Sequence, residues 1–140
     1  MQNVLTPTLS VVVTVYNTEK YITDCLQSVI NQSLQNFEII IVDGGYPDHS
    51  MKICRQFAEK YDNITIVKAD GKGPGDSRNC GMAAARGEYV TFVDGDDIID
   101  TEMYAQLMAE ISENNLDAVY CTCYRFFDDD LSNLSMRNIN

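Results

Sequence analysis

Two runs of β-branched residues restrict the fold of this 140-residue chain more than any other feature. "LSVVVTVYN" (residues 9–17) and "FEIIIVD" (residues 37–43) are apolar at both alternating positions, the pattern of a strand that is buried on both faces. Such strands belong to parallel sheets that helices cover on both sides. We therefore expect an α/β fold with helices on both faces of a sheet.

Helical patterns separate these strands from the ones predicted further along. Apolar residues recur at helical spacing after residue 18, after residue 50 and around residues 101–114, and an Ala-rich helix follows "GPGD". The remaining strands are predicted at "ITIV" (64–67), "EYVTFVD" (88–94) and "DAVYCTCYRF" (117–126), before a tail without periodicity. This alternation predicts an open, mostly parallel, Rossmann-like sheet with right-handed crossovers, in which ligands bind beyond the carboxyl ends of the strands.

Local signals predict the helix ends. Asn17 or Thr18 is expected to cap the first helix and Asp76 the third, while Gly87 is expected to end the third in a left-handed conformation. His49, the only histidine, is expected at the surface or at a helix start.

Composition narrows the class of protein. Residues 1–140 are expected to form one domain with a core over about residues 9–124. A net charge of -11 argues against a nucleic-acid partner, because phosphate binding needs a cationic surface. The sequence shows neither a membrane-spanning run nor a secretory signal, so a cytoplasmic protein is expected, with peripheral membrane contact left open. The five cysteines are expected to be reduced packing residues, with Cys121 and Cys123 on one face of a strand.

Three carboxylates follow the fourth predicted strand in "TFVDGDDIID": Asp94, Asp96 and Asp97. Carboxylates crowded at the end of a buried strand repel one another unless a cation is present, and Mg²⁺ and Mn²⁺ prefer oxygen ligands. A metal held by one or two carboxylates keeps positions free for a diphosphate. A solvated acidic turn is the alternative interpretation.

Three further residues are candidates for nucleotide binding. Asp43 ends the second strand, where it could either begin a turn or accept a hydrogen bond from a nucleobase ring N–H. Tyr16 ends the first strand and offers a stacking face, although a half-buried tyrosine there needs no ligand. Arg78 opposes the helix dipole near a helix N-terminus, so an anionic ligand or an acidic side chain would explain it.

Together, "SVVVTVYNTEKYITDCLQSVINQSLQNFEIIIVDGG" and "GPGDSRNCGMAAARGEYVTFVDGDD" resemble the N-terminal, donor-binding half of family 2 glycosyltransferases with the GT-A fold, over about residues 9–124. The resemblance implies a metal-dependent enzyme of polysaccharide biosynthesis that moves a sugar, with inversion, from a nucleotide-sugar to an acceptor hydroxyl. The implied donor is a UDP-sugar and the implied acceptor a saccharide or lipid-linked saccharide. "DGD" resembles the DxD motif, which holds Mn²⁺ or Mg²⁺ on the donor diphosphate.

The resemblance also implies a role for each candidate. Tyr16 and Asp43 match nucleobase-contacting positions, and Arg78 matches the arginine of an "ARN"-like motif. Asp94 matches the acid that faces the ribose or sugar. Asp96 matches the metal contact, with Asp97 as a supporting acid.

The sequence also departs from the family pattern. "DGGYPD" stands where "DDGSTD" is common, so Gly44 replaces an acid, and Asp76 stands where a small residue is usual. The general base and the acceptor-binding part are expected beyond residue 140, which would leave a chain that binds donor better than it transfers sugar. Association through Phe126 and Phe127 into a homo-oligomer is left open.

Three alternatives compete with this assignment. A non-catalytic nucleotide-sugar-binding fragment would carry the same motifs. A sugar-phosphate nucleotidyltransferase should have a Gly-rich, basic loop after the first strand, where this chain has "YNTEKY". A phosphorylatable receiver module needs an acidic pair where Tyr16 and Asn17 stand.

Overall fold

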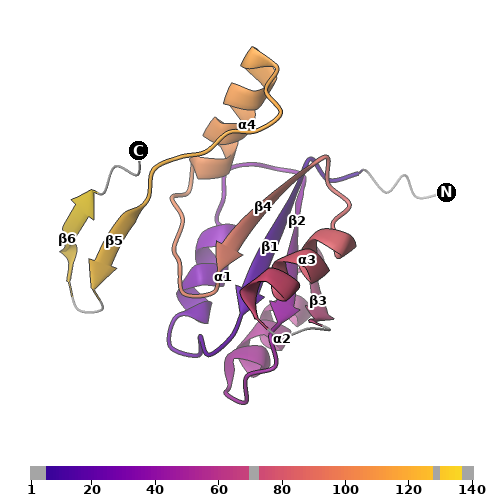
Figure 1. The fold of residues 1–140 in the computed structure, drawn as a ribbon, viewed down its shortest axis with the longest axis vertical. Coiled ribbons are helices and arrows are strands. Elements are labelled where there is room, and N and C mark those ends of the chain that lie inside the picture. The colour runs from indigo at the N-terminus through magenta and orange to yellow at the C-terminus, as the bar shows by residue number, and fades with distance from the viewer. Residues whose placement is uncertain (1–5, 70–72, 128–129, 137–140) are drawn as a thin grey trace. The chain divides into compact units, whose positions relative to one another are not determined.

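The computed structural model describes residues 6–69, 73–127 and 130–136. The chain divides into two compact units, Met1–Met103 and Tyr104–Asn140. The first unit confirms the predicted α/β class: it holds a four-stranded, fully parallel sheet in the order β3-β2-β1-β4 (Figure 1). Its elements are β1 (Leu9–Val15), α1 (Ile22–Ile30), β2 (Phe37–Asp43), α2 (Ser50–Lys60), β3 (Ile64–Lys68), α3 (Pro74–Ala84) and β4 (Tyr89–Asp94).

Helices cover both faces of this sheet, because β1 and β2 are apolar on both faces. Val12, Ile40 and Val42 form a buried cluster on the face that α3 covers. The side chains between them in sequence, such as Val11 and Ile41, point to the other face and are also fully buried. On that face α1 and α2 supply apolar side chains to the core: Ile22, Cys25, Leu26, Val29, Met51 and Cys54.

The strand register brings the predicted acids to one edge. Val15 pairs with Asp43 on one side of β1, and Thr14 pairs with Asp94 on the other. Since β1 lies between β2 and β4, both acidic strand ends flank the carboxyl end of the same central strand.

Two of the predicted helix caps are wrong. The side chain of Thr18 bonds Ser50 across the fold, while its carbonyl accepts the N–H groups of Tyr21 and Ile22, and α1 begins after Tyr21. Helix α3 begins after Gly73 with Pro74 in its first turn, so Asp76 lies inside the helix. Proline suits the first helical position because its fixed φ is already helical.

The left-handed conformation predicted for Gly87 is also wrong. Helix α3 ends at Ala84, and Gly87 has no positive φ. A Cβ at Gly87 would lie 2.7 Å from the backbone nitrogen of Ser10. Glycine is required there because the chain entering β4 passes close to β1.

A buried polar network stabilises the close approach of the segment before β4 to β1. Glu38 of β2 is 4% exposed, and its carboxylate accepts hydrogen bonds from Ser10 Oγ (2.7 Å), the Arg86 backbone N–H (2.8 Å) and Arg86 Nη2 (2.6 Å). Burial alone would raise the pKa of Glu38, but these hydrogen bonds and the guanidinium charge hold the pKa below its ordinary value.

The second unit corrects the predicted fifth parallel strand. It contains α4 (Met103–Asn114), which begins where the first unit ends, and the strands β5 (Tyr124–Phe127) and β6 (Asp130–Met136). These two strands pair antiparallel with each other in a separate sheet. Strand β5 overlaps the end of the predicted strand 117–126, whereas β6 lies in the tail that was expected to lack periodicity. An antiparallel partner needs only a short connection, whereas a parallel one needs a crossover.

The prediction that the cysteines are reduced packing residues holds for some of them and fails for others. All five are free, as expected, and Cys25 and Cys54 are buried packing residues. Burial raises the pKa of Cys25 to about 12, so this thiol stays neutral. Cys121 and Cys123, in contrast, are exposed and precede β5, so the predicted packing role on a strand face is wrong for both. Within the described residues, no helix is long and apolar enough to cross a membrane.

Candidate active site

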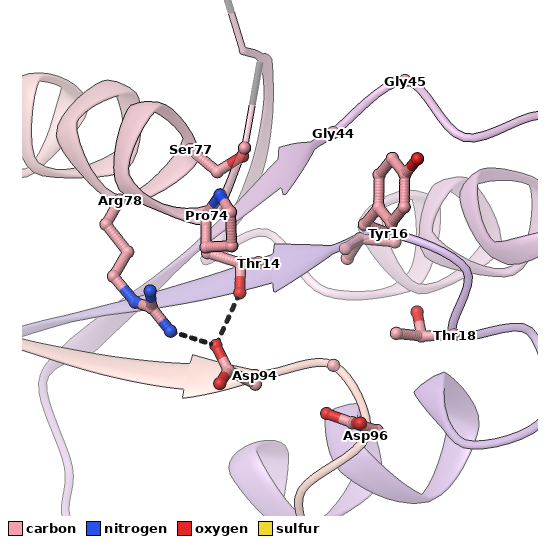
Figure 2. Close-up of a pocket in the computed structure, with 13 residues that line it drawn as sticks. Thr14, Tyr16, Thr18, Gly44, Gly45, Pro74, Ser77, Arg78, Asp94 and Asp96 are labelled. Atoms are coloured by element: carbon pink, nitrogen blue, oxygen red, sulfur yellow. Dashed lines mark hydrogen bonds and ion pairs between the residues drawn. The ribbon is translucent and has the colours of Figure 1, made fainter. Parts of the chain in front are cut away.

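A cleft of about 770 Å³ opens at the carboxyl edge of the sheet in the first unit (Figure 2). Its walls come from the ends of β1 and β4, the turn after β2 and the first turns of α3. The lining residues are Thr14, Val15, Tyr16, Thr18, Gly44, Gly45, Gly73, Pro74, Ser77, Arg78, Asp94, Gly95 and Asp96.

The strand order explains why the cleft forms here. The chain builds outward from β1 to β2 and β3, then returns to place β4 on the other side of β1. Connections that leave neighbouring strands in opposite directions open a crevice beyond their carboxyl ends. The β1–β4 boundary is this switch point, and Thr14 and Asp94 face each other across it.

Asp94 is held in place by two donors from different elements. Thr14 Oγ1 donates to Asp94 Oδ1 at 2.9 Å, and Arg78 Nη2 donates to the same oxygen at 2.8 Å. Arg78 comes from the second turn of α3, so this ion pair ties the helix to the end of β4. The side chains are 38% and 47% exposed, so solvent screening limits the pair to about 0–1 kcal/mol of stability. Its main effect is therefore to orient the carboxylate.

Asp96 and Asp97 differ in their positions around the turn. Asp96 lines the cleft, and its carboxylate makes no hydrogen bond or ion pair within the part of the chain that the structure describes. Asp97 is exposed and does not line the cleft. Partial desolvation of the Asp97 carboxyl by neighbouring protein atoms raises its pKa, and the negative charges of Asp96 and Asp94 raise it further.

This arrangement fits a divalent cation that the protein holds only in part. Among residues 6–69, 73–127 and 130–136, no three His, Cys, Asp or Glu side chains converge as a metal cage. The free, exposed carboxylate of Asp96 beside Asp97 can nevertheless supply one or two oxygen ligands. Mg²⁺ commonly binds proteins in this way, with substrate phosphates and water completing the shell.

Gly95 allows the chain to turn tightly between the acids. Its N–H donates to Thr14 O at 2.9 Å, and a Cβ there would lie 2.9 Å from the same oxygen and 3.1 Å from Thr18 Oγ1. Any larger residue would therefore push the acidic turn away from β1.

Tyr16 lies in the cleft and Asp43 lies beside it, at the ends of β1 and β2. Tyr16 lines the cleft with its side chain 63% exposed. Asp43 is not among the lining residues, and its Oδ1 accepts a hydrogen bond from the Gly45 N–H at 2.8 Å. Gly45 has φ of 82°, a conformation that favours glycine. The turn-forming role that the sequence left open for Asp43 is therefore present.

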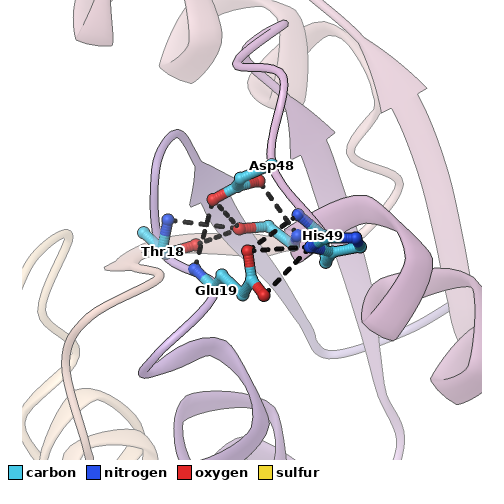
Figure 3. Close-up of polar contacts among 5 residues, drawn as sticks. Thr18, Glu19, Asp48 and His49 are labelled. Carbon is cyan, nitrogen blue, oxygen red and sulfur yellow. Dashed lines mark hydrogen bonds and ion pairs between the residues drawn. The ribbon is translucent and has the colours of Figure 1, made fainter.

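A polar cluster ties together the loops after β1 and β2 (Figure 3). The Thr18 backbone N–H donates to Ser50 Oγ at 3.2 Å, and the Glu19 backbone N–H donates to Asp48 Oδ2 at 3.3 Å. In return, the Glu19 carboxylate accepts the His49 backbone N–H at 3.1 Å and pairs with His49 Nδ1 at 3.0 Å. His49 lies at the start of α2, as predicted. Because Thr18 lines the cleft, this cluster fixes part of its wall.

The structure thus brings Tyr16, Arg78, Asp94 and Asp96 to one cleft, with Asp43 and Asp97 directly beside it. Sequence reasoning missed Thr14, Thr18 and Ser77. A polar residue at the end of an otherwise apolar strand was the available signal for Thr14. The contacts of Thr18 depend on Ser50, which is distant in the chain, and no local pattern indicates that Ser77 lines the cleft.

Comparison with known proteins agrees with this geometry. The family model described as glycosyl transferase family 2 matches residues 10–139. Glycosyltransferase GlyG of Streptococcus pneumoniae is 37% identical over 123 residues, which cover 87% of this chain and 41% of that protein. The poly(ribitol-phosphate) beta-glucosyltransferase of Bacillus spizizenii is 38% identical over 113 residues, or 78% of this chain and 18% of that protein. The chain spans less than half the length of each of these relatives.

Solved structures show the same fold. S. aureus TarS, determined with UDP-GlcNAc, superposes with a TM-score of 0.71 and 36% identity over 77% of this chain and 32% of that chain. A mannosyltransferase from Pyrobaculum calidifontis superposes with a TM-score of 0.70 at 23% identity, over 76% of this chain and 32% of that chain, which supports the fold alone. With its GT-A-type sheet and the family match over nearly its whole length, this chain belongs to glycosyl transferase family 2.

Proposed function

We propose that the cleft binds a nucleotide-sugar and that the chain contributes this donor site to a metal-dependent, inverting glycosyltransferase. The observation that carries the proposal is the pairing of an oriented carboxylate, Asp94, with the free carboxylate of Asp96 at the switch point of the sheet. Such a crevice is where ligands bind in open α/β sheets.

A uridine nucleotide is the donor that we propose. TarS, 36% identical over the compared segment, was solved with UDP-GlcNAc and with UDP. In our assignment the nucleobase stacks on Tyr16 at the β2 end of the cleft. The diphosphate then points toward Asp96, and Asp94 faces the ribose or sugar.

The start of α3 favours the diphosphate in this orientation. Gly73, Pro74 and Ser77, all in or next to the first turns of the helix, line the cleft. The N-terminal end of a helix carries partial positive charge and free N–H groups, which attract anions. Arg78 lies on the same wall, where its guanidinium pairs with Asp94 and offsets the negative charge of that acid.

Asp96, supported by Asp97, would hold Mn²⁺ or Mg²⁺. When bound, the cation offsets negative charge that develops on the departing diphosphate. Thr14 and Arg78 hold Asp94 in position through one oxygen. Its second oxygen can then accept a hydrogen bond from a hydroxyl group of the nucleotide-sugar. Orientation of this kind brings the sugar into a reactive geometry before the acceptor arrives.

For the acceptor, we propose a saccharide or a lipid-linked saccharide of a surface polysaccharide. The relative from Bacillus spizizenii is named for glucosylation of poly(ribitol-phosphate), and another from Bacillus subtilis is named for minor teichoic acid biosynthesis. Both are much longer than this chain, so the acceptor assignment extends beyond the described cleft.

A panel of donors tests the proposal. The chain is mixed with Mn²⁺ and UDP-glucose, UDP-GlcNAc, UDP-galactose or GDP-mannose, and thermal unfolding and nucleotide release are measured with and without saccharide acceptors. A UDP-sugar at 100 times its Kd should stabilise the fold by about 2.7 kcal/mol, and Asp94→Asn should reduce this stabilisation. Stabilisation without nucleotide release would favour a non-catalytic binding module, and no response to any nucleotide would reject the donor site.

A further inference from the structure

We propose that Tyr46 is a positioning residue for the nucleobase: it packs against the Tyr16 ring and fixes the face that Tyr16 presents to the base. This inference rests on the proposed nucleotide-sugar function and assigns a role to the "DGGYPD" segment, where the chain departs from its family pattern.

The two rings are in direct contact. Their centroids lie 4.9 Å apart with an interplanar angle of 61°, an edge-to-face pair. This geometry is one that aromatic rings prefer, because the positive edge of one ring meets the negative face of the other. Tyr16 lines the cleft, whereas Tyr46 is not among the lining residues. Tyr46 therefore acts on a ligand through Tyr16.

The backbone around Tyr16 leaves its ring a defined space. The Gly44 N–H donates to Val15 O at 2.9 Å, which brings the turn after β2 against the end of β1. A Cβ at Gly44 would lie 3.3 Å from both Cβ and Cδ2 of Tyr16 and 2.8 Å from Val15 O. The absence of a side chain at Gly44 therefore lets the Tyr16 ring lie close to this turn.

The loop that carries Tyr46 is anchored on both sides. Before it, Asp43 Oδ1 accepts the Gly45 N–H, and after it the Asp48 N–H donates to the Tyr46 carbonyl at 3.0 Å. Asp48 in turn accepts the Glu19 N–H from the loop that follows Tyr16. The two tyrosines thus belong to loops that are tied to each other, so their contact is a fixed part of the cleft wall.

A fixed Tyr16 ring lowers the cost of binding a base. A tyrosine that is 63% exposed at a strand end would otherwise exchange between rotamers, and binding would have to immobilise it. Immobilising one such side chain on binding lowers affinity roughly 2- to 10-fold. We expect Tyr46 to contribute this factor to uridine-nucleotide binding through Tyr16.

A double-mutant cycle tests the coupling. UDP affinity in the presence of Mn²⁺ is measured by calorimetry for the unsubstituted chain, Tyr16→Ala, Tyr46→Ala and the double variant. We expect Tyr46→Ala to weaken binding roughly 2- to 10-fold when Tyr16 is present and to have no further effect when Tyr16 is already alanine. A purely structural role for Tyr46 in its loop would instead persist in the Tyr16→Ala background, and that result would overturn the inference.

Two further variants complete the design. Tyr46→Phe keeps the ring and removes the hydroxyl, so it should retain the affinity of the unsubstituted chain. Tyr61→Ala removes an aromatic pair with Phe57 at the far end of α2 and should leave UDP binding unchanged. Thermal unfolding confirms that each variant is folded.

The outcomes separate this inference from the proposed function. UDP binding that is equally tight in Tyr46→Ala and the unsubstituted chain would reject the role of Tyr46 and leave the donor site standing. Failure of the unsubstituted chain to bind UDP would reject both.

Discussion

Asp94 Oδ1 accepts two hydrogen bonds, from Arg78 Nη2 at 2.8 Å and from Thr14 Oγ1 at 2.9 Å. Within the described part of the chain, its other carboxylate oxygen has no hydrogen-bond partner. The acid is therefore oriented by α3 and β1 through one oxygen and offers the other to the cleft. Because only one oxygen is engaged, the hydrogen bonds from Arg78 and Thr14 can be tested separately from the carboxylate of Asp94.

Thr14→Val tests the orientation of Asp94, because valine keeps the shape of threonine and removes only the donor. We expect a loss of about 0.5–1.5 kcal/mol in stability together with weaker UDP-sugar binding. Urea unfolding and calorimetry measure the two effects. Thr65→Val, at an exposed position of β3, is the matched control. Unchanged UDP-sugar affinity in Thr14→Val would show that Arg78 alone suffices to orient Asp94.

Gly81→Ala tests how closely α3 packs on β1, because its steric cost opposes a gain in helix propensity. Alanine is the better helix former by about 1 kcal/mol, but a Cβ at Gly81 would collide with the Val12 side chain of β1. We expect a net destabilisation of about 1–3 kcal/mol. Gly75→Ala in the same helix has open space around the added methyl group and should be neutral or stabilising. Chemical denaturation of both variants decides the point, and a Gly81→Ala variant as stable as Gly75→Ala would contradict the packing of α3 on β1.

The Glu38 network predicts a pH dependence of stability. Because the folded-state pKa of Glu38 is lowered from 4.5, the folded chain releases this proton more readily than the unfolded chain. The contribution is therefore fully present above pH 4.5 and is lost as the pH falls through the lowered pKa. Glu38→Gln should cost about 1–3 kcal/mol near pH 7, and its difference from the unsubstituted chain should shrink in acid.

Urea unfolding at pH 7, 5, 4 and 3 measures that difference. Glu59→Gln, at an exposed position of α2, serves as the control. A difference for Glu38→Gln that stays constant over this range would mean that the charge of Glu38 contributes nothing to folding.

The sequence could predict the elements whose signals are local. β-branched runs located β1 and β2, and the register of parallel strands then places Asp43 and Asp94 at one edge, as found. Close approach between distant segments carries no such signal. Gly87 looked like a helix end, but its role depends on the backbone of Ser10, which lies far away in the sequence.

The partner of Arg78 shows the same limit. The sequence indicated that a cation in the first turns of α3 needs an anion, but only the crossover connection to β4 identifies Asp94 as the partner. The strand at β5 was misplaced because β-forming residues favour a strand without specifying its partner, and here β6 supplies it. No local pattern indicates a role for Tyr46, because its contact with Tyr16 joins two separate loops.

Calorimetric titration of UDP, with Mn²⁺ and then with a chelator, tests the central claim most directly. The same titration is run on Asp96→Asn, which removes the free carboxylate in the cleft, and on Asp62→Asn, which removes an exposed acid outside it. We predict that UDP binds the unsubstituted chain and Asp62→Asn only with Mn²⁺ and that Asp96→Asn loses most of this binding. Equal UDP affinity with and without chelator, or in Asp96→Asn and Asp62→Asn, would contradict a metal-dependent donor site at Asp96.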